Sequence, residues 1–454
     1  MNLYKLAMAR AEAGRPVTAG IVGAGKFGTM FLTEARATKG LHVVAVADLD
    51  IAHARQQLKM ACWPAAQFSA GSFDGAVAGG TTFLTDDAAA MIADPRIEVI
   101  VEATGNPATG IELCQLAIAH GKHVIMVNVE ADALAGPLLA RKATAAGVIY
   151  SLAWGDQPAL ICEQVDWARA CGFNVVAAGK GTRYHPSYHA STPETLWEIL
   201  DKYLVIKDRA SINPKMFNSF IDGSKSGIEM TAVCNATGLA AQGDGLSFPA
   251  ASRFELADVC KPQTAGGVLQ RAGVTEVVSS VDRHEQDVPH HLSMGTFVVF
   301  EADKDNDYAR RCFREYNMLQ DKSGHYAALY RPIHMIGLEL GISVLSVALR
   351  GEATGAPHCF NSDVVATAKR DLKAGEILDG EGGYCVWGRQ MPAAASLSGG
   401  HLPLGLAHDL PLQRDIAAGE ALRWSDVRLD EADATLQFRR DMEDEFAPSL
   451  SPSG

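Results

Sequence analysis

Residues 17–28 read VTAGIVGAGKFG, with glycines at Gly23, Gly25 and Gly28. An apolar strand that runs directly into G-x-G-x-x-G is typical of a turn that leads into a helix and binds the diphosphate of a dinucleotide. The first glycine allows the tight turn, the second lets the backbone approach the anion, and the third lets the helix pack closely against the strand. Unpaired N–H groups at the start of the helix, around Lys26 and Phe27, would bind the diphosphate. The stretch therefore predicts a nucleotide-binding strand, turn and helix.

Four further apolar runs follow this strand and alternate with helical segments. Strands that are covered on both faces read as near-continuous apolar runs, and their alternation with helices indicates a parallel sheet. We therefore predict the α/β class, with a doubly wound parallel Rossmann sheet in a cofactor domain over residues 1–156. The predicted strands are VTAGIV (17–22), LHVVAVA (41–47), IEVIVEA (97–103), HVIMVNV (123–129) and VIYSLA (148–153).

Polar side chains at the ends of these strands are candidates for binding the rest of the cofactor. Asp48 lies twenty residues beyond Gly28 and would accept hydrogen bonds from the adenosine ribose. Its carboxylate repels a 2′-phosphate and favours NAD(H), whereas His53 and Arg55 could compensate for NADP(H), so the sequence leaves both cofactors open. The candidates nearer the nicotinamide are Thr104, Gly105, Asn106 and Asn128.

Three further segments are expected after the cofactor domain. Residues 157–350 predict a second, α+β domain with a mixed or antiparallel sheet, which carries the catalytic residues. Residues 351–430 predict a small β-rich module, because KRDLKAGEIL from Lys369 recurs as QRDIAAGEAL from Gln413. Residues 431–454 are acidic, then rich in Pro and Ser, and predict a disordered tail.

The composition excludes several classes of protein. A net charge of -13 argues against a nucleic-acid or anionic-membrane surface. The nine cysteines form no C-x-x-C pair, so neither a disulfide framework nor a thiolate zinc site is indicated. The first residues are too charged for a signal peptide, and the apolar segment 333–349 is too short and polar for a membrane span. We expect a cytoplasmic protein, with 333–349 as a buried helix.

Charged residues gather in the segment 213–230, NPKMFNSFIDGSKSGIEM. If the chain is helical from Asp222 onward, then Asp222, Lys225 and Glu229 share one face. We predict Lys225 as a proton donor to a carbonyl oxygen and Asp222 as its partner, with Lys180 and Glu229 as further catalytic residues. The alternative is a solvated stripe of salt bridges, which the apolar neighbours in this segment disfavour. The candidates for substrate contacts are Lys215, Asn218, Arg331 and His334.

Several motifs together resemble known enzymes. GIVGAGKFG, VVAVADLD, VEATGNP, KHVIMVNVEAD and GDQP resemble the cofactor domain of homoserine dehydrogenases, and the repeat near 370 and 414 resembles a SAF module. The chain to about residue 428 is similar to the DXR-like enzymes, through VNVEAD, GDQPAL, AAGKGT, MFNSF-DG-KS-IEM and YRP-H-IGLEL. It departs from homoserine dehydrogenases at Asn128, which is followed by Val129 and Glu130 where they carry an Asn-Lys pair.

The resemblance to DXR-like enzymes implies a reductoisomerase that uses NADPH. It would convert 1-deoxy-D-xylulose 5-phosphate to 2-C-methyl-D-erythritol 4-phosphate in isoprenoid biosynthesis. A reductoisomerase of the ordinary kind holds Mg²⁺ or Mn²⁺, and Asp222, Glu229 or Glu130 are candidate ligands for such an ion.

Two alternatives to the reductoisomerase remain. One is a plain NAD(P)-dependent dehydrogenase of a sugar acid, a sugar phosphate or an amino-acid semialdehyde. The other is a protein that senses NAD(P) without turnover. For the enzyme we expect a small phosphorylated sugar or sugar acid as substrate, no nucleic acid, no membrane, and assembly into a homo-oligomer.

Overall fold

The computed structural model describes every residue except 1, 205–208, 210–211, 304 and 451–454. The chain forms two compact units: unit 1 is Met1–Glu163 with His334–His358, and unit 2 is Gln164–Ile333 with Cys359–Gly454. Helix α8 (Gln157–Ala170) begins in unit 1 and ends in unit 2. This division differs from the predicted boundaries, because a segment of the expected second domain returns to unit 1 and the expected third module belongs to unit 2.

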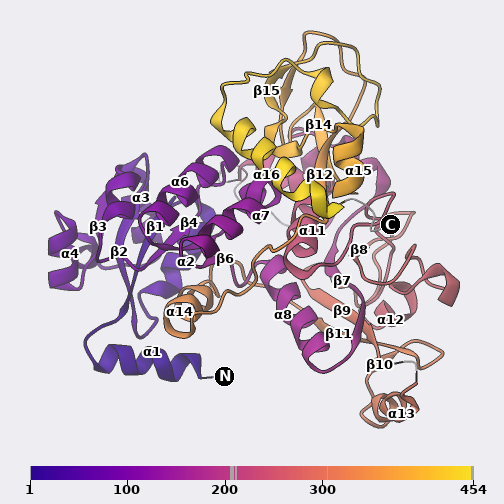
Figure 1. Ribbon diagram of the computed structural model, residues 1–454, viewed down its shortest axis with the longest axis horizontal. Coiled ribbons are helices and arrows are strands. Elements are labelled where there is room, and N and C mark those ends of the chain that lie inside the picture. Colours follow the sequence, from indigo (N-terminus) through magenta and orange to yellow (C-terminus); the bar gives the residue numbers. More distant parts are fainter. Residues whose placement is uncertain (1, 205–208, 210–211, 304, 451–454) are drawn as a thin grey trace. The chain divides into compact units, whose positions relative to one another are not determined.

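Unit 1 is built on a six-stranded sheet in which all neighbouring strands are parallel and the order is β3-β2-β1-β4-β5-β6 (Figure 1). The chain runs outward from β1 in one direction and from β4 in the other, which is the doubly wound arrangement that places ligands at the point of reversal. The predicted Rossmann sheet is therefore confirmed. The strands are β1 (Val17–Val22), β2 (Leu41–Ala47), β3 (Phe83–Thr85), β4 (Val99–Glu102), β5 (His123–Met126) and β6 (Tyr150–Leu152).

Short polar side chains cap several helices of unit 1. Asn106 accepts a hydrogen bond from the N–H of Thr109 at 3.0 Å, and Pro107 occupies the first helical position. Asn128 accepts from the N–H of Ala131 at 3.1 Å. Such caps satisfy backbone donors that the helix itself leaves unpaired. The helices are α1 (Leu3–Glu12), α2 (Lys26–Ala35), α3 (Ile51–Met60), α4 (Phe73–Gly79), α5 (Ala88–Ala93), α6 (Pro107–Ala119), α7 (Val129–Ala145) and α14 (Gly341–Arg350).

Helix α14 is the segment that returns from the far part of the chain. Val344, Leu345 and Val347 join the same buried core as Ile21 of β1 and Phe31 of α2. Only the second half of the predicted helix 333–349 is helical, as α14, whereas residues 333–340 form a loop with turns. The helix covers a face of the Rossmann sheet and is not part of the second domain. Among the described residues, no helix combines the length and apolar character that crossing a membrane requires.

Unit 2 holds a five-stranded sheet with the order β10-β11-β9-β7-β8. Strands β7 and β8 are parallel and the other pairs are antiparallel, which confirms the predicted mixed sheet. The strands are β7 (Asn174–Thr182), β8 (Val274–Ser279), β9 (Thr296–Glu301), β10 (Leu319–Gln320) and β11 (Tyr326–Arg331). The helices of this part are α9 (Leu196–Leu200), α10 (Pro214–Ile221), α11 (Ser224–Thr237), α12 (Leu256–Val259) and α13 (Asp307–Glu315).

The two copies of the sequence repeat pair with each other in the C-terminal part of unit 2. The N–H of Ala374 in the first copy donates to the carboxylate of Asp415 in the second copy at 2.9 Å. The N–H of Ala418 in the second copy donates to the carboxylate of Asp371 in the first, also at 2.9 Å. Leu372 and Ile416 exchange backbone hydrogen bonds of 2.9 and 3.0 Å. The predicted repeat is therefore a pair of interlocked, two-fold related segments, while the SAF assignment stays a prediction. This part contains β12 (Ser362–Ala368), β13 (Ile377–Asp379), β14 (Val386–Pro392), β15 (His408–Pro411), α15 (Ala393–Gly399) and α16 (Ala434–Leu450).

Helix α16 corrects the prediction of a disordered tail. Phe438, Met442 and Phe446 are buried, and Arg439 is completely buried. The Arg439 guanidinium donates to Asp363 of β12 at 2.7 Å and to Glu443 at 2.9 Å. The segment is therefore an amphipathic helix despite its acidic composition, and the buried ion pair of Arg439 with Asp363 attaches it to β12. Residues 451–454 lie outside the described part of the chain.

Candidate functional site

The glycine turn after β1 has the geometry that binds a diphosphate. Gly23 has φ +94°, and a Cβ there would lie 2.6 Å from the carbonyl oxygen of Ala103. A Cβ at Gly28 would lie 2.1 Å from the carbonyl oxygen of Gly23, so close packing of α2 on the turn requires glycine. In contrast, a Cβ at Gly25 would meet nothing within 4 Å. The side of the turn at Gly25 is thus open to an anion.

The start of α2 lies beside this opening. Within the described residues, no side chain caps the helix at Gly25, and backbone N–H groups at the start of a helix favour an anion. Lys26 is exposed at the first helical position, while Phe27 is half-buried and packs on the core of unit 1. The residues present therefore fit the diphosphate of NAD(P).

Asp48 lies beside the turn, as predicted. Its Oδ2 accepts from the N–H of Ala24 at 2.8 Å, and its Oδ1 accepts from the N–H of Asp50 at 3.0 Å. The ring of His53 lies 3.9 Å from the Asp48 carboxylate, and the Arg55 guanidinium lies 5.8 Å from the ring centre of Phe68. The structure thus fixes a carboxylate where the adenosine ribose is expected, and Arg55 stacks on an aromatic ring.

The loop after β4 is supported by a buried acid. The Glu102 carboxylate accepts from the N–H of Thr104 at 2.9 Å and from the Thr104 hydroxyl. Asn128 donates from Nδ2 to the carbonyl of Asn106 at 2.9 Å, which ties the ends of two strands together. Burial raises the pKa of Glu102 to about 7. The predicted residues Thr104, Gly105, Asn106 and Asn128 therefore lie together at the carboxyl edge of the sheet, where a cofactor crosses it.

A second buried acid lies between α7 and β6. Asp132 is fully buried, and its Oδ1 accepts from the Tyr150 hydroxyl at 2.7 Å. Burial raises the pKa of Asp132 to about 7, as it does for Glu102. Both acids thus bind protons in the neutral range.

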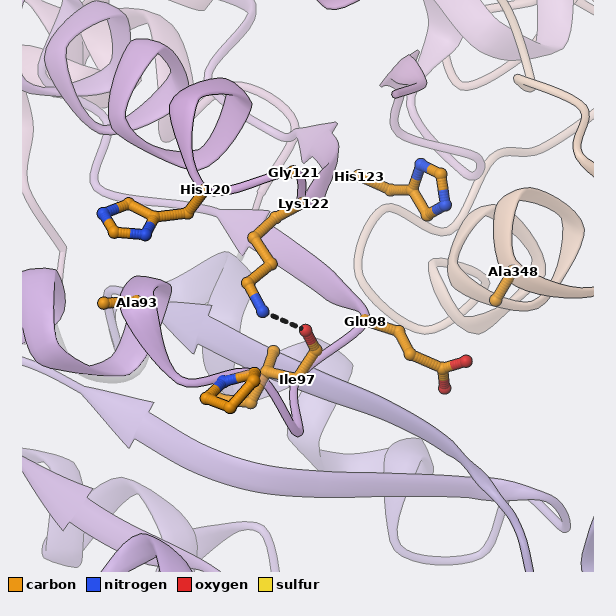
Figure 2. A pocket seen from close by; sticks show the side chains of 9 residues that line it. Ala93, Ile97, Glu98, His120, Gly121, Lys122, His123 and Ala348 are labelled. Atoms are coloured by element: carbon orange, nitrogen blue, oxygen red, sulfur yellow. Dashed lines mark hydrogen bonds between the residues drawn. The ribbon is translucent and has the colours of Figure 1, made fainter. Parts of the chain in front are cut away.

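A pocket of about 420 Å³ lies at the opposite edge of the same sheet, near the start of β4 and β5. Figure 2 shows Lys122 reaching across it to the backbone of Ile97. The Lys122 ammonium donates to the carbonyls of Asp94 and Ile97 at 2.6 and 2.8 Å, and burial lowers its pKa. Ligands of doubly wound sheets bind at the carboxyl edge, so we interpret this lysine as a structural link between two loops.

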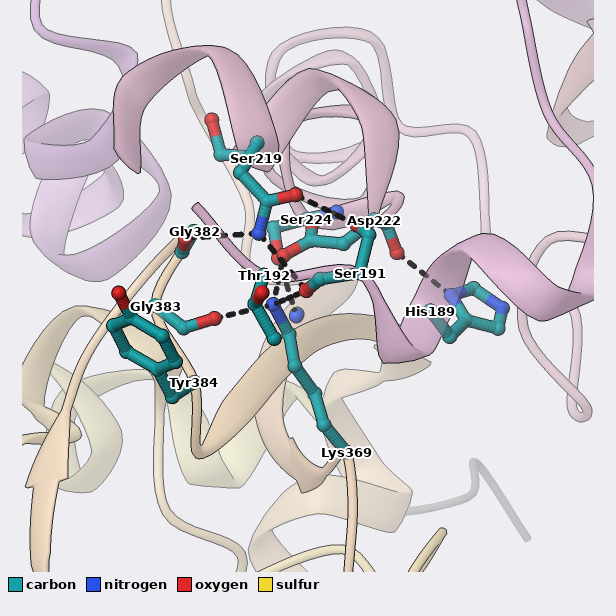
Figure 3. Close-up of polar contacts among 12 residues, drawn as sticks. His189, Ser191, Thr192, Ser219, Asp222, Ser224, Lys369, Gly382, Gly383 and Tyr384 are labelled. Carbon is teal, nitrogen blue, oxygen red and sulfur yellow. Dashed lines mark hydrogen bonds and ion pairs between the residues drawn. The ribbon is translucent and has the colours of Figure 1, made fainter. Parts of the chain in front are cut away.

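In unit 2, Asp222 is paired with a lysine from the C-terminal part of the chain. The Lys369 ammonium lies 2.7 Å from the Asp222 carboxylate and donates to the carbonyls of Ser191 and Gly383 at 2.8 and 2.7 Å (Figure 3). Asp222 is fully buried, which raises the pKa of its carboxyl group, while Lys369 and Ser224 oppose that shift. The predicted partner of Asp222 was Lys225, so the structure corrects this assignment.

The predicted helical face is also corrected. Helix α10 ends at Ile221 and α11 begins at Ser224, so Asp222 lies in the turn between them. Gly223 in that turn has φ +91°, which breaks the helix. Lys225 and Glu229 remain four residues apart on α11 and share a face.

Lys180 and Glu229 form an ion pair between β7 and α11, and both side chains are at most 3% exposed. Two of the predicted catalytic residues, Lys180 and Glu229, are therefore in contact, and the third, Lys225, is buried on the face of α11 that carries Glu229. The ammonium of Lys225 lies 5.9 Å from the ring centre of Phe220.

The predicted substrate-binding residues are distributed differently. Asn218 donates from its amide to the carbonyls of Ser191 and Gly382 and accepts from the Ser191 hydroxyl, so both its donors are used inside the protein. Lys215 is exposed and donates to the carbonyl of Asp379. These contacts indicate structural roles for both residues.

Arg331 ends β11 in unit 2, whereas His334 belongs to the segment of unit 1 that leads into α14. Arg331 is half-buried, and its Nε donates to the carbonyl of Ile333 at 3.0 Å. Of these two candidates, only Arg331 shares a compact unit with Lys180 and Glu229.

The structure adds His189, which was not among the candidates from the sequence. Its Nδ1 bonds the carbonyl of Asp222 at 2.7 Å, and because a carbonyl only accepts, Nδ1 carries the proton and Nε2 accepts from the Tyr184 hydroxyl at 2.9 Å. The ring stacks on Trp387 at 3.6 Å, and burial lowers the pKa of His189 to about 4. His189 is thus a neutral support for the Asp222 turn, recognisable only from the tertiary structure.

The candidate ligands do not fit a divalent metal. Asp222 and Glu229 are each ion-paired with a lysine, and Glu130 belongs to the other unit. Within the described ranges, no three His, Cys, Asp or Glu side chains gather as a metal site would require.

Two family models match separate parts of the chain. Residues 17–126 match a family described as "Oxidoreductase family, NAD-binding Rossmann fold". Residues 155–340 match one described as "Oxidoreductase DRL, catalytic domain". The chain therefore joins an NAD(P)-binding Rossmann domain of the oxidoreductase type to a segment similar to an oxidoreductase catalytic domain. Neither description names a reductoisomerase.

Individual proteins give weaker similarities. The chain is 30% identical over 123 residues to a homoserine dehydrogenase of Methylobacillus glycogenes, a match that spans 25% of this chain and 25% of that enzyme. An NAD-binding oxidoreductase from Klebsiella pneumoniae is 19% identical, with 37% of this chain and 43% of that chain covered and a TM-score of 0.28. A biliverdin reductase from Synechocystis is 16% identical, with 42% and 60% covered and a TM-score of 0.26.

Proposed function

We propose that the protein is an NAD(P)-dependent dehydrogenase that interconverts a carbonyl and an alcohol of a small, sugar-like substrate. The observation that supports this most is the glycine turn, where an open face at Gly25 adjoins the uncapped start of α2. Both family matches, which are to oxidoreductases, agree with it.

The bound cofactor would supply or accept a hydride at its nicotinamide. Gly23, Gly25 and Gly28 would hold its diphosphate, Asp48 its adenosine ribose, and the Thr104–Asn106 loop its nicotinamide ribose. Glu102 would act as a positioning residue, because its carboxylate holds Thr104 through both the N–H and the hydroxyl.

Lys225 is the proposed proton donor to the carbonyl oxygen. It is a buried residue, and it shares a face of α11 with the Glu229 carboxylate. Lys180 is the proposed substrate-binding cation, held in place by Glu229. The Asp222 and Lys369 pair supports the turn that precedes Lys225.

NAD(H) is the proposed cofactor. The Asp48 carboxylate is fixed by two backbone N–H groups, and Arg55 stacks on Phe68, so neither the charge nor the geometry favours a 2′-phosphate. Asp48→Asn should therefore lower the preference for NAD⁺ over NADP⁺ by at least about tenfold, measured as the ratio of the two dissociation constants. An unchanged ratio would contradict the role given to Asp48.

The experiment that tests the proposed function has two stages. Calorimetric titration of NAD⁺ and NADP⁺ establishes binding, and consumption of NADH or NADPH is then followed with a panel of sugar, sugar-acid and semialdehyde carbonyl compounds. Steady turnover excludes a protein that only senses the cofactor. Product analysis with 1-deoxy-D-xylulose 5-phosphate tests the reductoisomerase, for which we find no supporting contact.

A matched pair of variants tests the proton donor. Lys225→Met should lower kcat by a factor on the order of a hundred to ten thousand, the range for loss of a general acid. Lys261→Met is the control, because Lys261 forms another buried ion pair in unit 2, with Asp321 at 2.8 Å. It should reduce stability and leave kcat nearly unchanged. Equal effects of both variants on kcat would remove Lys225 from the mechanism.

A further inference from the structure

Three polar residues form one row across the sheet of unit 2. Lys180 of β7 pairs directly with Thr296 of β9, and Thr296 pairs directly with Arg331 of β11. Directly paired residues of antiparallel strands project to the same face, and neighbouring strands lie about 4.8 Å apart. Because Lys180 contacts Glu229 of α11, the row lies on the side of the sheet that carries α11. Two cationic side chains therefore flank one hydroxyl.

The hydroxyl at the centre of this row lacks a partner. Thr296 is completely buried, yet its Oγ1 makes no hydrogen bond within the described part of the chain. Ser226 on α11 is also buried, and its Oγ has no partner there either. Ser226 precedes Glu229 by three residues, so the two side chains lie on one face of the helix. Buried polar groups are normally satisfied, so these hydroxyls indicate a place for a polar ligand.

The charges of the row suit an anion. Two of its three members, Lys180 and Arg331, are cationic, and Thr296 between them offers a hydroxyl. Lys180 uses one of its three N–H groups for Glu229, so donors remain for a ligand. A guanidinium presents paired donors that match a phosphate or a carboxylate, and the bond from Arg331 Nε to Ile333 fixes its plane.

We propose that Lys180, Thr296 and Arg331 bind the anionic group, phosphate or carboxylate, of the substrate whose carbonyl is reduced. Arg331, the half-buried member, forms the rim of this subsite, and Thr296 its floor. The inference rests on the proposed dehydrogenase function and adds the substrate class to it. It assigns a role to Thr296, a residue of the strand GTFVVF that nothing in its local sequence distinguishes.

The test uses the full chain saturated with NAD⁺, so that the glycine turn is filled and cannot bind the probe. Inorganic phosphate and acetate are titrated separately by calorimetry in a chloride-free buffer. The variants are Thr296→Val, which removes the hydroxyl at almost constant volume, and Arg331→Met. The controls are Thr296→Ser, which keeps the hydroxyl, and Lys373→Met, which removes an exposed charge paired with Asp415.

The wild-type protein, Thr296→Ser and Lys373→Met should bind the better of the two probes equally well. Thr296→Val and Arg331→Met should bind it at least about tenfold more weakly, as expected for loss of a charge-assisted hydrogen bond. Tighter binding of phosphate identifies a phosphorylated substrate, and tighter binding of acetate a carboxylate.

Equal affinities for all five proteins, or an equal loss in Lys373→Met, would overturn the subsite. Thr296→Val should unfold at the same or higher urea concentration than the wild type, because it removes an unsatisfied buried hydroxyl. Weaker anion binding with unchanged stability therefore cannot come from misfolding. Failure of the proposed function would be seen earlier, as absence of NAD⁺ binding, and so is distinguishable from failure of the subsite.

Discussion

The buried pair of Lys369 and Asp222 should control the stability of unit 2. Lys369→Met removes an ammonium that lies 2.7 Å from the carboxylate of Asp222 and bonds the carbonyls of Ser191 and Gly383. The Asp222 side chain is 0% exposed and that of Lys369 is 2% exposed, so water cannot replace the lost partner. Breaking a buried ion pair from one side costs about 3–5 kcal/mol, because the remaining charge is left uncompensated.

The dependence of this loss on pH has a definite sign. Burial raises the pKa of Asp222 and Lys369 lowers it, so the pKa rises further in Lys369→Met. An acid whose pKa is higher in the folded than in the unfolded protein favours folding at low pH, and that contribution is lost as pH rises through the folded pKa. The destabilisation of Lys369→Met should therefore be largest at neutral pH and shrink toward acid pH.

The assay is urea unfolding at pH 5 and pH 7.5 of the wild type, Lys369→Met, Asp222→Asn and the double variant. Trp387 stacks on His189, which bonds the Asp222 carbonyl, so its fluorescence reports on this region. The free energy of unfolding of the double variant should exceed the value expected from adding the two single losses by at least about 1 kcal/mol, because the two residues are in contact and their effects are coupled. Lys373→Met, which removes an exposed charge, should cost less than about 1 kcal/mol. A loss below that value for Lys369→Met, or additivity of the two single effects, would refute the reasoning.

Three further predictions concern other parts of the chain. Gly25→Ala should fold normally, because the added Cβ meets nothing within 4 Å, and should weaken NAD⁺ binding at least about tenfold in calorimetry. Gly28→Ala should weaken binding and also lower the melting temperature, because the added Cβ would lie 2.1 Å from the carbonyl oxygen of Gly23. The pKa of Glu102 is raised from 4.5 to about 7, so the folded protein binds a proton at this carboxyl group more tightly than the unfolded chain does. The stability that results is lost as pH rises from about 4 to 7, and the loss is roughly 3 kcal/mol. Glu102→Gln should flatten that part of the pH dependence in urea unfolding, and an identical slope in the variant would contradict it. Arg439→Met should leave Asp363 buried without its cation and lower stability by about 3–5 kcal/mol, while Arg440→Met, on the more exposed side of α16, should have little effect on the urea midpoint.

The Rossmann half of the fold was predictable because its signals are local. The glycine turn from Gly23 and the apolar strands each depend on a few adjacent residues, and the structure confirms them. The return of α14 to the same sheet was not predictable in this way. Its apolar pattern indicates burial but does not say which sheet it covers.

The error at Asp222 has a local cause that the sequence does contain. The interpretation assumed one helix from Asp222 onward, yet Gly223 separates α10 from α11 with φ +91°. A glycine between two helical stretches is a signal for such a break. Its partner Lys369 could not be found from sequence spacing, since the contact joins distant parts of the chain.

The tail shows the same contrast between a local and a distant signal. Phe438, Met442 and Phe446 recur every four residues, which is the spacing of one helical face and outweighs the acidic composition. The burial of Arg439, however, depends on Asp363 of β12, and no pattern within the tail predicts it.

The proposed anion subsite depends on strand register more than on any motif. Lys180 was a predicted catalytic residue and Arg331 a predicted substrate contact. Thr296 was not a candidate, since a threonine in GTFVVF is an ordinary strand residue. Only the pairing of β7, β9 and β11 places the three side chains in one row, with the hydroxyl between the two cations. A shift of one residue in β9 would turn Thr296 to the opposite face and replace it by Phe297, so the register itself determines whether the row can bind an anion.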